Sequence, residues 1–112
     1  EIMTTYTEFV ASPQAVRDPF KKAKLQQIAR LLQGALAAEG LVGLKMNVRK
    51  SDADKVIAKL PSLNAPTVAH LYQKDWLSVE TVISAHAVRE LVPILLDSGA
   101  EGIIEYPLNK VI

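Results

Sequence analysis

The sequence has 112 residues, no cysteine and a formal net charge of +1; 49% of its residues are hydrophobic and 22% are charged. This length suits one domain with a single core that buries roughly 65% of its unfolded surface, and the near-neutral charge argues against a dedicated nucleic-acid or membrane-surface binder. The composition excludes disulfides and thiolate chemistry, no apolar run reaches the ~20 residues of a membrane span, and no signal peptide is visible, so we expect a cytoplasmic protein.

The first forty residues predict a strand and a long helix. Residues 2–11 are rich in Thr, Tyr, Phe and Val, which favour strands. Asp18 followed by Pro19 is a strong helix start, because Asp accepts hydrogen bonds from first-turn amides and Pro suits the first helical position. Apolar residues then recur at i, i+3, i+4 spacing. We expect this helix to end near Glu39, with Gly40 just beyond it.

The next two predicted elements are a strand and a short helix. Residues 41–48, LVGLKMNV, predict the strand. Ser51 is expected to cap the helix, with Asp54 at the capping-box position. The helix is expected to continue to Leu60 and to be stopped by Pro61, which cannot extend it.

The clearest pattern lies in residues 66–83. Two apolar, β-branched runs, 66–72 and 76–83, flank a polar step of three residues, which predicts a β-hairpin. Side chains in the second run alternate between two faces of the strand. The mainly apolar face is expected to meet a layer of helices, and it comprises Leu77, Val79, Thr81 and Ile83.

A helix and a strand complete the chain. Ser84 is an N-cap candidate for a helix that ends before Gly99, and residues 102–106 predict a final strand. From residue 41 the order is β-α-β-β-α-β, which predicts an α+β, ferredoxin-like sandwich with four antiparallel strands and two helices on one face. We assign residues 41–112 to this domain. Residues 1–40 would supply an extra strand, which needs a neighbouring sheet or domain, and a connecting helix.

Little in the sequence points to catalysis. The two histidines, His70 and His86, are not at metal-ligand spacing, glycine-rich phosphate motifs are absent, and no acid, base or nucleophile is clustered. We therefore expect no metal site. Asn47 stands out within a strand, because an amide buried there without partners costs free energy. From the residues alone, an exposed or turn-forming Asn47 is an equal alternative.

Four segments together resemble one family: LKMNV, LPSLNAPTVAHL, DWLSVETVI and GAEGIIEYPLNKVI. Over residues 19–112 the chain resembles the C-terminal regulatory, histidine-binding domain of long-form ATP phosphoribosyltransferase, the first enzyme of histidine biosynthesis. Residues 1–17 resemble the last strand and exit segment of that family's catalytic region. The sequence departs from the family pattern at Arg49, at His70 and at the pair Glu105-Tyr106.

The resemblance implies a division of labour between this chain and a parent enzyme. The parent condenses ATP with phosphoribosyl pyrophosphate, using magnesium, in two catalytic domains that this chain does not contain. The chain itself would carry no catalytic residue, no metal and no cofactor. Its partners would be L-histidine, the missing catalytic domains and other copies of the chain, since the parent forms dimers and hexamers and histidine favours an inhibited hexamer.

The resemblance also implies a set of histidine contacts, which match Asn47, Leu63, Thr67, Thr81, Val82 and Gly102. Free histidine presents a carboxylate, an ammonium and an imidazole, and burying these groups requires several hydrogen bonds. The side chains of Asn47 and Thr67, with carbonyls near Leu63 and Thr81, would hold the ammonium and the imidazole. Amides near Gly102 would hold the carboxylate, since a missing side chain lets a ligand approach the backbone.

Two other functions remain open from the sequence. The first is a free-standing sensor of a small ligand with a ferredoxin-like or ACT-like fold. The second is an enzyme built on the same fold, against which the lack of clustered catalytic groups argues.

Overall fold

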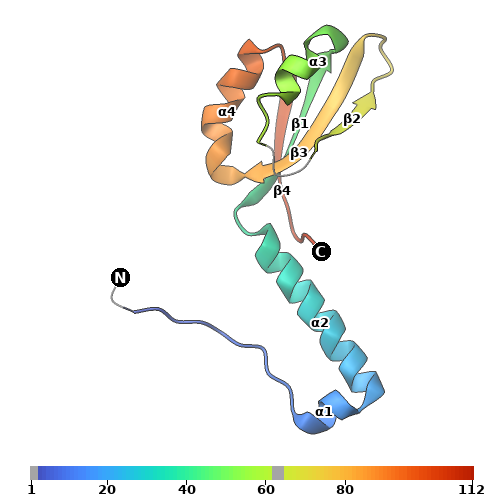
Figure 1. The fold of residues 1–112 in the computed structure, drawn as a ribbon, viewed down its shortest axis with the longest axis vertical. Coiled ribbons are helices and arrows are strands. Elements are labelled where there is room, and N and C mark those ends of the chain that lie inside the picture. Colours follow the sequence, from blue (N-terminus) through green and yellow to red (C-terminus); the bar gives the residue numbers. More distant parts are fainter. Residues whose placement is uncertain (1–2, 62–64) are drawn as a thin grey trace. The chain divides into compact units, whose positions relative to one another are not determined.

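The computed structural model describes residues 3–61 and 65–112, and the chain divides into two compact units (Figure 1). The first unit comprises residues 1–37 and 110–112, and the second comprises residues 38–109. Among the described residues, no helix is both long and apolar enough to cross a membrane.

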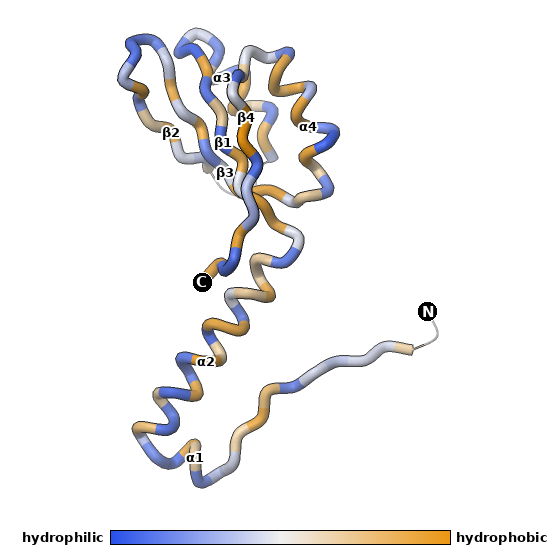
Figure 2. Tube along the Cα trace, turned by 180° about the vertical axis from the view of Figure 1, so that it is seen from behind, coloured by the Kyte–Doolittle hydropathy of each residue, from blue (hydrophilic) through white to orange (hydrophobic). Residues whose placement is uncertain are grey.

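The first unit contains two helices with side-chain caps. Helix α1 (Pro13–Arg17) begins after Ser12, whose hydroxyl accepts a hydrogen bond from the amide of Ala15 at 3.2 Å. Helix α2 (Pro19–Ala38) follows Asp18, whose Oδ1 accepts from the amides of Phe20 at 3.0 Å and Lys21 at 3.3 Å. The predicted start of the long helix is thereby confirmed. Figure 2 shows hydrophobic and hydrophilic residues alternating along α2.

The strand predicted over residues 2–11 is wrong in the described part of that range. Residues 3–12 contain no helix or strand. A strand needs a neighbour for its backbone amides and carbonyls, and the sheet of the second unit is assembled without this segment. Thr, Tyr and Val fit a pleated surface where one exists, so the composition alone misleads here.

The C-terminal residues of the chain belong to the first unit. The amide of Val111 donates to the carbonyl of Gly34 in α2 at 2.9 Å. A Cβ at position 34 would lie 2.8 Å from a side-chain carbon of Ile112, so this glycine lets the tail approach the helix.

The second unit is a four-stranded antiparallel sheet with two helices. Its elements are β1 (Leu41–Arg49), α3 (Lys50–Ile57), β2 (Thr67–His70), β3 (Trp76–Ser84), α4 (Ala85–Asp97) and β4 (Glu101–Pro107). The strands lie in the order β2-β3-β1-β4, and every neighbouring pair is antiparallel. The unit therefore has the predicted ferredoxin-like α+β fold, and each predicted strand from residue 41 onward is present.

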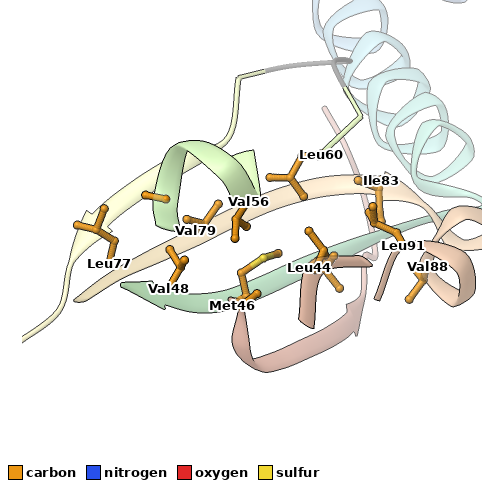
Figure 3. Packing of buried hydrophobic residues seen from close by; sticks show 13 residues of the cluster. Leu44, Met46, Val48, Val56, Leu60, Leu77, Val79, Ile83, Val88 and Leu91 are labelled. Carbon is orange, nitrogen blue, oxygen red and sulfur yellow. The ribbon is translucent and has the colours of Figure 1, made fainter. Parts of the chain in front are cut away.

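The core lies between one face of the sheet and the two helices (Figure 3). From the sheet, β1 contributes Leu44, Met46 and Val48, and β3 contributes Leu77, Val79 and Ile83. The helices contribute Ala53 and Val56 from α3 and Val88, Leu91 and Leu95 from α4. The predicted helix-facing side of β3 is thus confirmed, including Thr81, which is buried there.

Two helix starts differ in how they are capped. Ser84 caps α4 as predicted, since its hydroxyl accepts from the amide of His86 at 3.3 Å. The cap predicted for α3 at Ser51 is wrong, because the helix begins at Lys50 and Arg49 is its N-cap residue. The amide of Lys50 donates to the carbonyl of Asp75 at 2.7 Å, so a loop carbonyl satisfies one of the first-turn amides that have no partner within the helix.

Candidate functional site

The sheet face opposite α3 and α4, called the open face below, carries the polar residues of the central strands. Because side chains alternate along a strand, the residues that lie between the core positions of β1 and β3 point to this face. The strand register aligns them in rows across the sheet. The rows are Thr67–Glu80–Lys45–Ile104, Ala69–Ser78–Asn47–Glu101, Val82–Gly43–Tyr106 and Trp76–Arg49.

Asn47 lies in β1 beside an irregularity of β4. It pairs with Ser78 of β3 on one side and with Glu101 of β4 on the other, and the β1–β4 register shifts between Lys45 and Asn47. The extra residue on β4 forms a bulge that contains Gly102 with φ of 57°. This left-handed conformation favours glycine. A Cβ on Gly102 would lie 3.7 Å from Nδ2 of Asn47, so the exposed backbone of Gly102 adjoins a half-buried amide.

Glu80 lies in the middle of the open face. Thr67 of the edge strand β2 and Lys45 of β1 are its register partners, and Ser78 and Val82 are its neighbours along β3 on the same face. Cross-strand partners of this kind have Cβ atoms ~4.5–5.5 Å apart. Thr67, Lys45, Ser78 and Val82 therefore flank Glu80 on this face of the sheet.

Tyr106 reaches Glu80 across a glycine. Its hydroxyl donates to Oε1 of Glu80, from β4 to β3 over the intervening strand β1. The ring lies over Gly43, where any Cβ would overlap the ring carbons. A glycine inside a strand often marks such a close approach, and here it makes the bridge between the outer and inner strands possible.

The hydrogen bond to Glu80 raises the pKa of Tyr106. The pKa of Tyr106 is raised above its ordinary value of 10.0, first because its hydroxyl bonds to Glu80, then because of burial and of the negative charge on Glu80. The raised pKa keeps the phenol protonated to a higher pH than an ordinary tyrosine, so that it remains a donor to the carboxylate.

Arg49 and Trp76 close one end of the open face. They are register partners at the end of the β1–β3 ladder, and the guanidinium carbon of Arg49 lies 4.9 Å from the centre of the Trp76 ring. A cation stacked on an indole in this way gains about 0.5–1 kcal/mol at an exposed site. The contact holds the two strand ends together and is separate from the Tyr106–Glu80 bond.

Comparison with known proteins identifies the fold's family. Residues 38–110 match the family described as HisG, C-terminal domain. The chain belongs to this family. It is 62% identical over all 112 residues to an ATP phosphoribosyltransferase of Desulfosudis oleivorans, and 60% identical over 111 residues to one of Desulfatibacillum aliphaticivorans. A third relative with the same name, from Solidesulfovibrio magneticus, is 57% identical over 112 residues.

The relatives are much longer than this chain. The matched part covers 100%, 99% and 100% of the chain in these three comparisons, but only 38% of each relative. The chain therefore spans well under half the length of the curated relatives that it matches.

Four of the six predicted ligand residues lie toward the open face of this HisG C-terminal domain. They are Asn47, Thr67, Val82 and Gly102, of which Thr67, Val82 and Gly102 are exposed and Asn47 is half-buried. The side chain of Thr81 instead points into the core and is 8% exposed, so only its backbone is available to a ligand. Leu63 lies outside the described residues.

Sequence reasoning did not select Glu80, Tyr106 or Gly43 for the site. One signal was present, because Gly43 interrupts an otherwise β-prone strand and such glycines mark close approaches. The residue that approaches Gly43 could not be predicted from the sequence, because it depends on the register between β1 and β4. The pair Glu105-Tyr106 was noticed only as a departure from the family pattern.

The described residues offer no site for a metal ion. Within residues 3–61 and 65–112, no three His, Asp or Glu side chains are grouped so that they could hold one. A pocket on α4 is lined by Ala85, His86, Arg89 and Glu90, and His86 is exposed there. The open face is the candidate for ligand binding, because the strand register brings four of the predicted ligand residues to it.

Proposed function

We propose that the chain is the regulatory domain of an ATP phosphoribosyltransferase and that it binds L-histidine for feedback inhibition. The observation that carries the proposal is the match over the whole chain, at 62% identity, to a protein named ATP phosphoribosyltransferase. The described residues support it, because they hold a polar open face on a ferredoxin-like sheet.

The parent enzyme would join ATP to phosphoribosyl pyrophosphate in the remaining part of its length, with magnesium bound there. Its product would be phosphoribosyl-ATP, formed in the first step of histidine biosynthesis. The present domain would bind the end product of that pathway and lower the rate of this step. Control of a first enzyme by a distant product requires a site separate from the catalytic one.

The open face offers the hydrogen-bonding groups that free histidine needs. The amide of Asn47 both donates and accepts, and the hydroxyl of Thr67 does the same. The backbone at the Gly102 bulge is open to a carboxylate, because no side chain covers it. Val82, which is 42% exposed, supplies an apolar surface beside these polar groups.

Other copies of the chain are proposed as partners. Strands β2 and β4 are the edges of the sheet, and an edge strand presents unpaired backbone groups to a neighbour. Sedimentation of the full-length protein with and without L-histidine tests this: we expect dimers and larger assemblies, with histidine favouring a hexamer. A protein that stays monomeric at high concentration under both conditions contradicts it.

The main test is an inhibition assay on the full-length enzyme. Phosphoribosyl-ATP formation is measured with saturating substrates over a range of L-histidine concentrations, for the wild type, Asn47→Ala and Asn109→Ala. Asn109 is an exposed asparagine outside the open face and serves as the matched control. We expect histidine to inhibit the wild type and the control alike, and to inhibit Asn47→Ala only at higher concentration. A rate that histidine does not change in the wild type overturns the proposal.

A further inference from the structure

We propose that Glu80 is the anionic group of this site, that it binds the ammonium of the amino-acid ligand, and that Tyr106 positions it. The inference rests on the proposed binding of histidine at the open face and adds to it a residue pair outside the six predicted contacts. The evidence is the place of Glu80 in the strand register and the bridge that Tyr106 makes to it.

The position of Glu80 is central among the predicted contacts. Thr67 is its register partner on β2, and Val82 is the next residue of β3 on the same face. Asn47 lies on the adjacent strand, opposite Ser78, which is the other same-face neighbour of Glu80. A ligand that touches Thr67, Val82 and Asn47 together therefore lies beside Glu80 on this face of the sheet.

The Glu80 carboxylate has binding capacity left over. Among the described residues, the Tyr106 hydroxyl is its hydrogen-bond partner and no cation forms an ion pair with it. An ionised carboxylate accepts about four hydrogen bonds, so most of this capacity is free. Lys45 is its register partner on β1 yet is exposed and makes no ion pair with it. The ammonium of an α-amino acid supplies the three donors that such a carboxylate accepts.

Tyr106 is a positioning residue in this arrangement. The close packing of its ring on Gly43 sets the height and direction of the hydroxyl over the sheet. The hydroxyl holds one oxygen of Glu80. This bond restricts the orientation of the carboxylate and therefore the position of its other oxygen. A long carboxylate side chain loses rotamer freedom when it binds a ligand, and a carboxylate already held by Tyr106 loses less of it.

The test compares two ligands that differ only in the ammonium. L-Histidine and imidazole-4-propionate share the imidazole and the carboxylate, and the second lacks the amine. Their affinities are measured calorimetrically on the full-length protein, with imidazole-4-propionate also measured by competition against L-histidine. The readout is the dissociation constant of imidazole-4-propionate divided by that of L-histidine. A merely structural change at the site alters both affinities together and leaves this ratio unchanged.

The expected results separate Glu80 from its surroundings. Glu80→Gln keeps the shape and still accepts from Tyr106, but we expect it to weaken L-histidine binding by about tenfold or more while changing imidazole-4-propionate binding less than about twofold. Tyr106→Phe keeps the ring over Gly43 but removes the hydroxyl that holds Glu80. We expect it to lower the ratio of the two dissociation constants by a few fold. Glu105→Gln, an exposed carboxylate that pairs with the core side of β1 at Leu44, is the matched control and should leave the ratio unchanged.

Each failure has its own meaning. If the wild type binds no L-histidine, the proposed function fails and this inference fails with it. If the wild type binds L-histidine and Glu80→Gln keeps the wild-type ratio, histidine binding stands and the role of Glu80 is overturned. Should Glu80→Gln not fold, as judged by its circular dichroism, the ratio measured in Tyr106→Phe decides: an unchanged ratio overturns the inference and a reduced ratio supports it.

Discussion

The two faces of the sheet come from the same strands but have opposite chemistry. On the helix-covered face of β1, Leu44, Met46 and Val48 are fully buried. On the open face of the same strand, Lys45 is exposed and Asn47 is half-buried. The covered face holds the fold together through burial of apolar area, so the open face is free to carry polar groups. The predictions below test this division, starting with the largest effect on stability.

Leu44→Ala should cause the largest loss of stability. Leu44 is fully buried between the sheet and the helices, and removing such a side chain costs about 2–5 kcal/mol in transfer energy and cavity. The control, Lys45→Ala, changes the next residue on the open face and should shift the free energy of unfolding by less than about 0.5 kcal/mol. Urea denaturation followed by circular dichroism measures both. Equal losses of unfolding free energy in the two variants would mean that the covered face does not stabilise the fold more than the open face does.

Gly43→Ala should be the most damaging small change on the open face. Its methyl group would overlap the Tyr106 ring, and overpacking of this kind costs about 1–3 kcal/mol. The double variant Gly43→Ala/Tyr106→Ala removes the ring that is in the way. We therefore expect it to be more stable than the sum of the two single losses predicts. Additive losses in the same denaturation experiment would refute the contact.

Tyr106→Phe should have a smaller effect that depends on pH. The variant loses the hydrogen bond to Glu80, which contributes about 0.5–1.5 kcal/mol. The pKa of Tyr106 is raised above 10.0 in the folded protein, so the folded state holds the phenolic proton more tightly than the unfolded state. This contribution is fully present below pH 10 and is lost as the pH rises through the folded-state pKa.

The measurement for Tyr106→Phe is the difference in unfolding free energy from the wild type between pH 7 and pH 11. The two proteins share every other ionisable group, so the effects of those groups cancel in the difference. We expect the gap to narrow as the pH rises above 10. A gap that is constant, or that widens with pH, would show that the hydroxyl does not bond to Glu80 in solution.

Most of the fold could be predicted because its signals are local. Asp18-Pro19 and Ser84 mark helix starts through their own side chains, and the alternation in β3 identifies its buried face. Predictions failed where a contact distant in sequence decides the outcome. Residues 3–11 have strand-forming composition but no strand partner among the described residues, and the start of α3 depends on a bond to the Asp75 loop rather than on Ser51.

The candidate site was less predictable than the fold for the same reason. Asn47 could be selected from its own strand, as an amide among apolar neighbours. The Glu80–Tyr106 bond joins residues 26 positions apart across a third strand, and its formation depends on the register that the Gly102 bulge helps to set. No periodicity reports a bulge in a partner strand, so the pair becomes visible only when the sheet is assembled.

The central claim is that the open face binds L-histidine through Asn47, and calorimetric titration of the full-length protein tests it most directly. We expect the wild type and the control Asn109→Ala to bind L-histidine with the same affinity. We expect Asn47→Ala to retain its stability without ligand, since water can replace its exposed contacts, but to lose about 1–3 kcal/mol of binding free energy because a ligand group is left unpaired. Equal affinity in the wild type and Asn47→Ala would remove Asn47 from the site, and no heat of binding in the wild type would contradict the account.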